Sequence, residues 1–182
     1  VALAVVGAAC TGGGGGKAAP QTTSAAPSTS TTAGVTTTTL DPTKSAILAA
    51  YRASWADYIA VAETFPVKPL DPRLAEHDTG TELTGDRKAL TELNVLGHYN
   101  VGTTDLAPVV TSTSGESAVV TDCVFDHSYE VDARTKSAVE QPDVGHTLYR
   151  FEMTRINDKW YVSDSMMLKS GKTEEACSPA AA

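Results

Sequence analysis

Apolar side chains recur every three or four residues just after residue 40, which is the spacing of one helix face. The positions are Leu48, Tyr51, Trp55, Tyr58, Ala62 and Phe65. Asp41-Pro42 precedes them and supplies a capping carboxylate and a proline at the first helical position. The spacing therefore predicts a long helix that begins after Asp41 and ends before Pro66.

Two shorter helices are predicted next. Asp71-Pro72 repeats the cap and opens the segment RLAEHD, which Gly80 ends. A looser apolar stripe then predicts a third helix over about 81–96, with Gly97 at its end and Gly85 inside it. An interior glycine costs a helix about 1 kcal/mol relative to alanine. The stripe consists of Leu83, Leu90, Leu93 and Leu96.

From His98 onward the pattern changes to runs rich in Val and Thr, which favour strands. Ser114-Gly115 and Asn157-Asp158 are typical of turns, and 132–144 is predicted to be a loop. Helices followed by consecutive strands indicate an α+β fold, with three helices packed on one face of a mainly antiparallel four-stranded sheet. The four predicted strands are 99–113, 117–131, 146–156 and 159–168.

The first ten residues predict export and attachment to the membrane. Val1–Ala9 is a short apolar run ending in small residues, typical of the second half of a secretory signal. Cys10 follows directly, and this arrangement resembles the lipobox of bacterial lipoproteins, although Gly7 stands where that motif prefers a branched apolar residue. The resemblance implies cleavage before Cys10 and lipidation of its thiol. The alternative is ordinary signal cleavage that leaves a free Cys10.

Residues 11–40 predict a tether. They contain ten Thr, six Gly, five Ala, three Ser and two Pro, with almost no large apolar side chain. Such a segment buries too little surface to offset the entropy of ordering, so we expect it to be disordered. The division expected from the sequence is a signal segment at 1–10, a tether at 11–40 and an α+β domain at 41–178.

The charge distribution limits the classes of partner. Lys17 is the single charge in residues 1–40, and all 22 acidic residues lie from Asp41 onward, where they outnumber 13 basic ones. Nucleic-acid binding needs clustered Lys and Arg, so it is not expected. No apolar run reaches the roughly 20 residues that cross a bilayer. The predicted membrane contact is therefore through the N-terminal lipid only.

Three cysteines fit an extracytoplasmic location, anchored at the outer face of the cell membrane or secreted. With Cys10 lipidated, Cys123 and Cys177 form an even pair in a compartment where disulfides persist. A bridge between them would contribute about 3–4 kcal/mol; the alternative is a buried free Cys123 and an exposed Cys177. No CxxC or HxxxH motif occurs, so no metal site and no cofactor are expected.

Four features of residues 45–168 carry a family resemblance: AILAAYRASWADYIAVA, PLDPRLAEHDTGTEL, Asp122-Cys123 within a strand, and RINDKWYVSDSMML. With them the segment resembles the nuclear-transport-factor-2-like superfamily, the cystatin-like α+β cone, and in particular such domains of secreted bacterial lipoproteins. The resemblance implies a pocket between the helices and the sheet. Some members of that superfamily are isomerases, dehydratases or polyketide cyclases, and others only bind or dimerise.

The alternation within 117–131 predicts which side chains face the pocket. The odd-numbered set from Val119 to Val131 is the more apolar, so it is expected inside, together with Tyr149, Phe151 and Met153 of the next strand. The candidate catalytic residues are then His127 as base and Tyr129 or Tyr149 as oxyanion donor, without a carboxylate to orient the histidine. The expected pocket-lining residues are Trp55, Tyr58, Phe125 and Phe151. A solvated charge network is expected on the other face, formed by Asp122, Asp126, Arg150, Glu152 and Asp164.

Three functions follow as hypotheses. The first is a lipid-anchored extracytoplasmic binding or accessory domain without catalysis, whose ligand or partner the sequence does not identify; a small apolar ligand and a second copy of the chain are the partners considered. The second is a small-molecule isomerase or dehydratase that uses His127 and an inner-face tyrosine. The third is a structural homodimer that packs outer sheet faces. No G-x-S-x-G elbow and no phosphate-binding loop occurs.

Overall fold

The first helix, α1, runs from Pro42 to Ala62 and begins at the predicted cap, since Oδ1 of Asp41 accepts the amide of Thr43 at 2.7 Å. It belongs to a computed structural model that describes residues 41–140 and 145–178. Ile47 and Tyr51 are fully buried on the side of α1 that meets the sheet. The predicted signal, tether and lipidation site at Cys10 lie outside the described residues.

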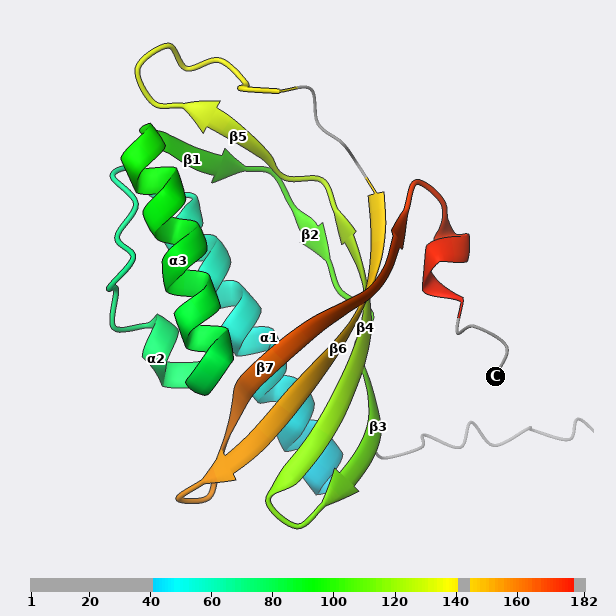
Figure 1. Cartoon of the computed structure of the whole chain (residues 1–182). Helices are drawn as coiled ribbons and strands as arrows, with labels where there is room; N and C mark the ends of the chain where they lie inside the picture. Colours follow the sequence, from blue (N-terminus) through cyan, green and yellow to red (C-terminus); the bar gives the residue numbers. More distant parts are fainter. Residues whose placement is uncertain (1–40, 141–144, 179–182) are drawn as a thin grey trace, which may run out of the picture. The chain divides into compact units, whose positions relative to one another are not determined.

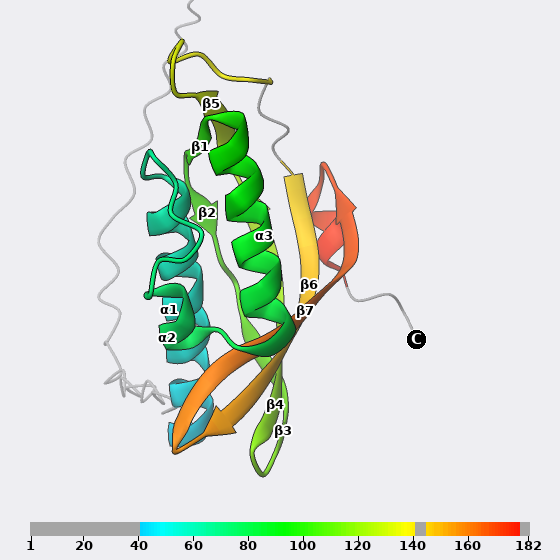
Figure 2. The same ribbon diagram turned by 60° about the vertical axis from the view of Figure 1, so that its left-hand side comes forward.

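The other two predicted helices are confirmed. The short α2 covers Leu74–His77 and α3 covers Gly80–Leu96. Gly97 caps α3 in the left-handed conformation, with a φ of 72°. Figures 1 and 2 show α1 and α3 side by side over one face of the sheet. A second hydrophobic cluster joins the helices and is formed by Val61, Ala62, Val67, Leu74, Leu90 and Leu93.

Five antiparallel strands form the main sheet, in the order β2-β4-β6-β7, with β3 also paired to β4. A separate ribbon pairs β1 (His98–Val101) with β5 (Tyr129–Asp132). The β6–β7 hairpin turns at Asn157-Asp158 as predicted, and both residues have a positive φ. The strands of the main sheet are β2 (Thr104–Asp105), β3 (Val109–Ser114), β4 (Ser117–Asp126), β6 (Gly145–Ile156) and β7 (Lys159–Gly171).

The prediction of four continuous strands is wrong, because two of the runs break opposite each other. Gly102 separates β1 from β2 with a φ of 133°, and a Cβ added there would lie 2.6 Å from the carbonyl oxygen of His127. His127 in turn separates β4 from β5, and its amide donates to the carbonyl of Thr103 at 2.9 Å. The paired breaks carry the β1–β5 ribbon away from the main sheet (Figure 1).

The buried face of β4 is the opposite of the one predicted. Val120, Asp122 and Val124 are buried, while the odd-numbered neighbours, Cys123 and Phe125 among them, are half-buried on the other face. The prediction assumed that the more apolar face is the inner one. The outer face is apolar here because a C-terminal 3-10 helix, η1 (Glu174–Cys177), packs near it against β6 and β7.

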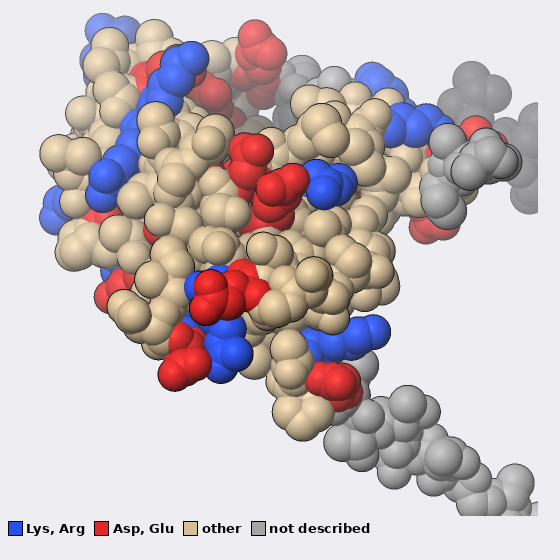
Figure 3. Space-filling model, turned by 60° about the horizontal axis from the view of Figure 1, so that its bottom comes forward, with Lys and Arg blue, Asp and Glu red and all other residues tan. Residues whose placement is uncertain are grey.

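The predicted disulfide between Cys123 and Cys177 is present, with the two Cα atoms 5.4 Å apart. It ties η1 to the middle of β4, and Ala176 is buried beneath it. On the same outer face Arg150 Nη1 lies 2.8 Å from Glu152 Oε1, as part of the predicted charge network. Figure 3 shows acidic and basic side chains next to one another on one face of the molecule.

Within the part of the chain that the structure describes, no helix combines the length and the apolar character needed to cross a bilayer.

Candidate functional site

A cavity of about 290 Å³ lies between α1, α3 and the inner face of the sheet. Residues from these elements line it together with the ribbon and the start of β2. Its lining comprises Ser54, Trp55, Tyr58, Ile59, Ala62, Glu63, Glu82, Asp86, Asn100, Gly102, Thr104, Asp126, Ser128, Tyr149, Phe151 and Ser165.

Four of these residues are aromatic. Trp55 and Tyr58 are three apart on α1, and Tyr149 and Phe151 are two apart on β6, so each pair shares one face of its element. The ring centroid of Phe151 lies 6.4 Å from that of Trp55 and 5.6 Å from that of Tyr149. The structure therefore brings Trp55, Tyr58, Tyr149 and Phe151 together as the sequence analysis expected. It places Phe125 on the other face of β4, away from the cavity.

Carboxylates form the opposite wall, and sequence reasoning missed them. Glu82 and Asp86 are four apart on α3 and both line the cavity. Asp78, four residues before Glu82 and in the link between α2 and α3, does not line the cavity and is 1% exposed. Neither of its carboxylate oxygens accepts a hydrogen bond of good geometry among the described residues, although the side chains of Ser54 and Asp86 lie near enough to interact with it and lower its pKa. The four-residue spacing of these three acids was the signal in the sequence.

Burial raises the pKa of each of the three acids. For Asp86 burial is the largest cause, the charges of Asp78 and Glu82 add to it, and the pKa rises to about 8. The pKa of Asp78 is raised by burial, and Ser54 opposes the rise. The pKa of Glu82 is also raised by burial, against a hydrogen bond from Ser165. Near neutral pH the Asp86 carboxyl is therefore largely protonated.

The two tyrosines of the cavity report the same electrostatic environment. Burial, followed by the charges of Asp86 and Asp126, raises the pKa of Tyr58 to about 12. The pKa of Tyr149 is raised by burial and by the charges of Asp126 and Glu82. No Lys, Arg or His is among the described residues that line the cavity. The cavity thus disfavours negative charge and holds both phenols protonated.

A buried hydrogen-bond chain fixes the aromatic wall. Trp55 Nε1 donates to the Tyr51 hydroxyl at 2.7 Å, and that hydroxyl donates to Asp122 Oδ2 at 2.7 Å. The amide of Ala107 donates to Asp122 Oδ1, also at 2.7 Å. The prediction of a solvated Asp122 is therefore wrong, because its oxygens are satisfied inside the protein. Asp126, expected in the same network, lies at the rim of the cavity.

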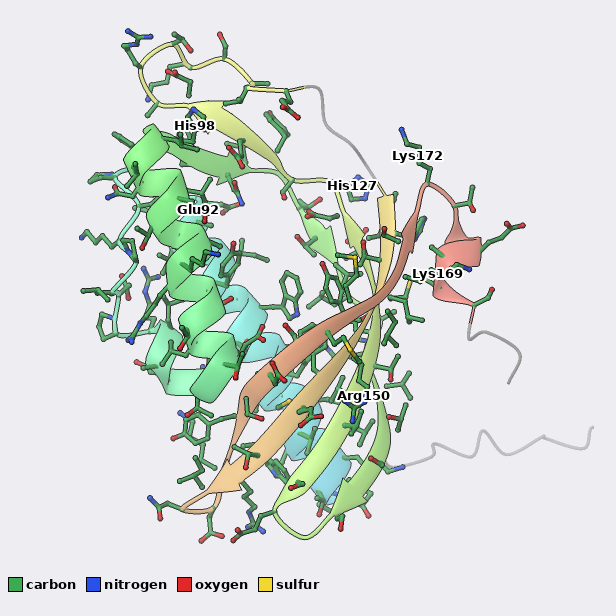
Figure 4. All side chains as sticks on the ribbon, viewed as in Figure 1. Glu92, His98, His127, Arg150, Lys169 and Lys172 are labelled. Atoms are coloured by element: carbon green, nitrogen blue, oxygen red, sulfur yellow. A yellow bond between two sulfur atoms is a disulfide. The ribbon has the colours of Figure 1, made fainter. Side chains whose placement is uncertain are left out.

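The predicted catalytic group is not assembled. His127 lies on the outer side of the sheet, where its ring contacts Phe125 at 4.1 Å and its Nε2 is 3.6 Å from Asp105 Oδ2. Figure 4 shows His127 beside the start of β6, away from the helices. Tyr129 belongs to the ribbon, opposite Val101, and does not line the cavity. Of the candidates, Tyr149 alone faces the cavity.

No protein-family model matches the chain, and no curated protein sequence matches it. Solved structures do. The intermembrane space region of the chloroplast protein ARC6 aligns with a TM-score of 0.50 and 16% identity, covering 71% of this chain and 98% of that one. A putative aromatic ring hydroxylase from Novosphingobium aromaticivorans gives 0.47 and 16%, covering 71% and 95%.

A type 2 hexachlorocyclohexane dehydrochlorinase (LinA) gives a TM-score of 0.41 and 12% identity, covering 69% of this chain and 88% of that one. These neighbours have the nuclear-transport-factor-2-like fold, in which helices pack on an antiparallel sheet. The coarser prediction, three helices packed on an antiparallel sheet in an α+β fold, is confirmed. At such low sequence identity the similarity concerns the fold alone.

Proposed function

We propose that the chain is an extracytoplasmic binding domain whose ligand is a small molecule held in the cavity between α1, α3 and β6. The observation that carries the proposal is a space of about 290 Å³ with four aromatic side chains along its walls. This volume is close to the lower end of the range for ligand pockets, about 300 Å³, so the ligand is small.

The aromatic wall supports binding because its members are held by regular secondary structure. Trp55 is hydrogen-bonded to Tyr51, which is fully buried in the core. Phe151 is 3% exposed and contacts Tyr51 with a centroid distance of 4.9 Å. A wall fixed in this way loses little conformational entropy when a ligand docks on it.

The proposal includes the tether. Lipidation at Cys10 would keep the domain at the outer face of the membrane, and residues 11–40 would allow it a reach of about 30 Å by random-coil scaling. The apolar run before Cys10 and the Gly/Thr-rich segment after it support this part. The Cys123–Cys177 disulfide is compatible with the same location.

Acid–base catalysis is the second candidate, favoured by the raised pKa of Asp86 at the cavity wall. In this version Asp86, rather than His127, transfers the proton of an isomerase or dehydratase. The test is exchange of carbon-bound protons in a bound ligand, followed by NMR in D2O. Exchange that stops in Asp86→Asn would support catalysis, and its absence in the wild type would exclude this version.

Ligand binding is tested by saturation-transfer NMR of the full chain against a library of cationic, neutral and anionic small molecules. Ser165→Phe fills the cavity, because Ser165 lines it. Ser170→Phe adds the same ring to an exposed position on the same strand. We expect some compounds to bind the wild type and Ser170→Phe but not Ser165→Phe. A library without such ligands would contradict the proposal.

A further inference from the structure

We infer that the cavity binds a small organic cation, either a protonated amine or a quaternary ammonium compound. This inference rests on the proposed function and names the chemical class of the ligand. It follows from the acidic wall, the aromatic wall and the spacing of the carboxylates.

The charges that meet in the cavity all have one sign. Glu82 and Asp86 lie in its wall, and Glu63 and Asp126 lie at exposed positions of the rim. No basic side chain lines the cavity among the described residues. An anionic ligand would meet no basic side chain and would be repelled by every carboxylate that is ionised, whereas a cation would favour the ionised carboxylates in a site partly screened from water.

Asp78 adds an observation independent of the lining. It is 1% exposed, and its two oxygens accept no hydrogen bond of good geometry among the residues described. It does not line the cavity itself, but Ser54 and Asp86, which do, both interact with its carboxyl group and lower its pKa. A buried carboxyl group whose oxygens accept no well-formed hydrogen bond is costly to ionise, and a cation bound nearby in the cavity would favour its charged form.

The aromatic wall suits an organic cation. Trp55, Tyr58, Tyr149 and Phe151 face the same space as the carboxylates. Cations are attracted to the faces of aromatic rings, and quaternary ammonium groups are recognised in this way. The tyrosines keep their protons, so neither ring carries a charge of its own.

Among the described residues, Asp78, Glu82 and Asp86 do not bring their carboxylate oxygens close enough together to form a compact three-ligand metal site. A metal ion needs several ligand atoms close together. No three oxygens of Asp78, Glu82 and Asp86 lie within 4.8 Å of one another, since the one such group found among 41–140 and 145–178 is Cys123, His146 and Cys177. Those two cysteines form the disulfide. Carboxylates distributed around a cavity fit a larger cation.

The titratable groups around Asp78, Glu82 and Asp86 make cation binding depend on pH. Glu82 faces Asp86 from α3, and Tyr58 faces it from α1. An ion pair faces Asp78, in which His77 Nδ1 lies 2.7 Å from Asp57 Oδ2. Asp164 faces Glu82 from β7. His77 is thus matched by Asp57, and the remaining groups are acidic or neutral. A cation would displace the proton that Asp78 and Asp86 otherwise hold, so its affinity should rise with pH.

The test uses isothermal titration of the full chain with choline, butylamine and 3,3-dimethylbutan-1-ol, the uncharged analogue of choline. We expect at least one cation to bind about tenfold or more tightly than the alcohol, with an affinity about tenfold higher at pH 9 than at pH 6. Choline and butylamine distinguish a quaternary ammonium from a protonated amine as the preferred group.

Asp86→Asn should weaken cation binding at pH 9 by about tenfold and flatten the pH dependence. Glu92→Gln is its matched control, because it removes one charge from an exposed position of the same helix (Figure 4). Glu82→Gln provides a second variant if Asp86→Asn does not fold. The inference is overturned if the alcohol binds as tightly as the cations, or if the cavity variants behave like Glu92→Gln.

The two proposals can fail separately. If neutral or anionic compounds bind in the cavity and are lost in Ser165→Phe, the binding function stands and the cationic ligand class is wrong. If no compound of any charge binds there, both proposals are wrong.

Discussion

Tyr51 donates a hydrogen bond to Asp122 across 71 residues of sequence, with 2.7 Å between its hydroxyl and Oδ2. Both residues are fully buried. The bond joins α1 to the central strand β4 directly beneath the aromatic wall of the cavity. The desolvation that raises the pKa of Asp122 is thus partly offset by this donor.

Removing the donor should cost stability. Tyr51→Phe keeps the ring and leaves Asp122 Oδ2 and Trp55 Nε1 without their partner, so we expect the free energy of unfolding to fall by about 2 kcal/mol. Urea denaturation followed by circular dichroism measures it. Tyr161→Phe, half-buried at the far end of the same sheet, is the control. Equal losses in the two variants would show that the buried bond contributes little.

Stability should decline as the pH rises. The pKa of Asp86 rises from 3.8 to about 8 on folding, so the folded chain binds more protons between these values and the free energy of unfolding falls across this window. We expect a loss of about 1–2 kcal/mol from pH 5 to pH 8, smaller in Asp86→Asn. Urea denaturation at several pH values measures the slope. Glu92→Gln is the control and should keep the wild-type slope. If Asp86→Asn also keeps it, groups other than Asp86 cause the pH dependence of stability.

Two glycines should respond oppositely to alanine. Gly102 has a φ of 133° and no room for a Cβ beside His127 and Ser128, so Gly102→Ala should destabilise the fold by about 2 kcal/mol or more. Gly85 lies inside α3 with open space around it, so Gly85→Ala should stabilise it by about 0.5–1 kcal/mol. Thermal unfolding midpoints measure both changes. If Gly102→Ala left the unfolding midpoint unchanged, the close approach of Gly102 to His127 and Ser128 would not be required for stability.

The disulfide should contribute about 3–4 kcal/mol, because it closes a loop with a sequence separation of 54. The double variant Cys123→Ser, Cys177→Ser should lose that amount in urea denaturation. Thiol titration of Cys10→Ser under denaturing, non-reducing conditions should give no free thiol, and reduction should release two. Free thiols before reduction would argue against the bridge.

Lipidation at Cys10 should be visible by metabolic labelling with a fatty-acid analogue in a bacterial host that processes lipoproteins. Wild type and Thr11→Ala should take up the label, and Cys10→Ala should not. The label is attached through the thiol, so equal incorporation in all three would rule out Cys10 as the attachment site.

The sequence predicts those elements that local chemistry specifies. Asp41 caps α1, Gly97 ends α3 and Asn157-Asp158 turns the last hairpin, because each depends on a few adjacent residues. The disulfide was predicted from the even pairing of Cys123 and Cys177. Three of the four expected lining residues also reach the cavity.

The predictions fail where residues that are distant in sequence determine which side chains are buried. Asp122 is buried because Tyr51 and Ala107 supply its hydrogen bonds, and neither is close in sequence. The outer face of β4 is apolar because η1 is tied to it through Cys177. Counting apolar residues on each face of one strand cannot detect either effect, so Phe125 and His127 were assigned to the wrong side.

Cys177 is bonded to Cys123 on the face of the sheet that points away from the cavity. A fluorophore or fusion partner joined after η1 would therefore start on the far side of β4 from the ligand. Immobilising the protein through that end would keep the cavity side of the sheet turned away from the support in a surface-based assay.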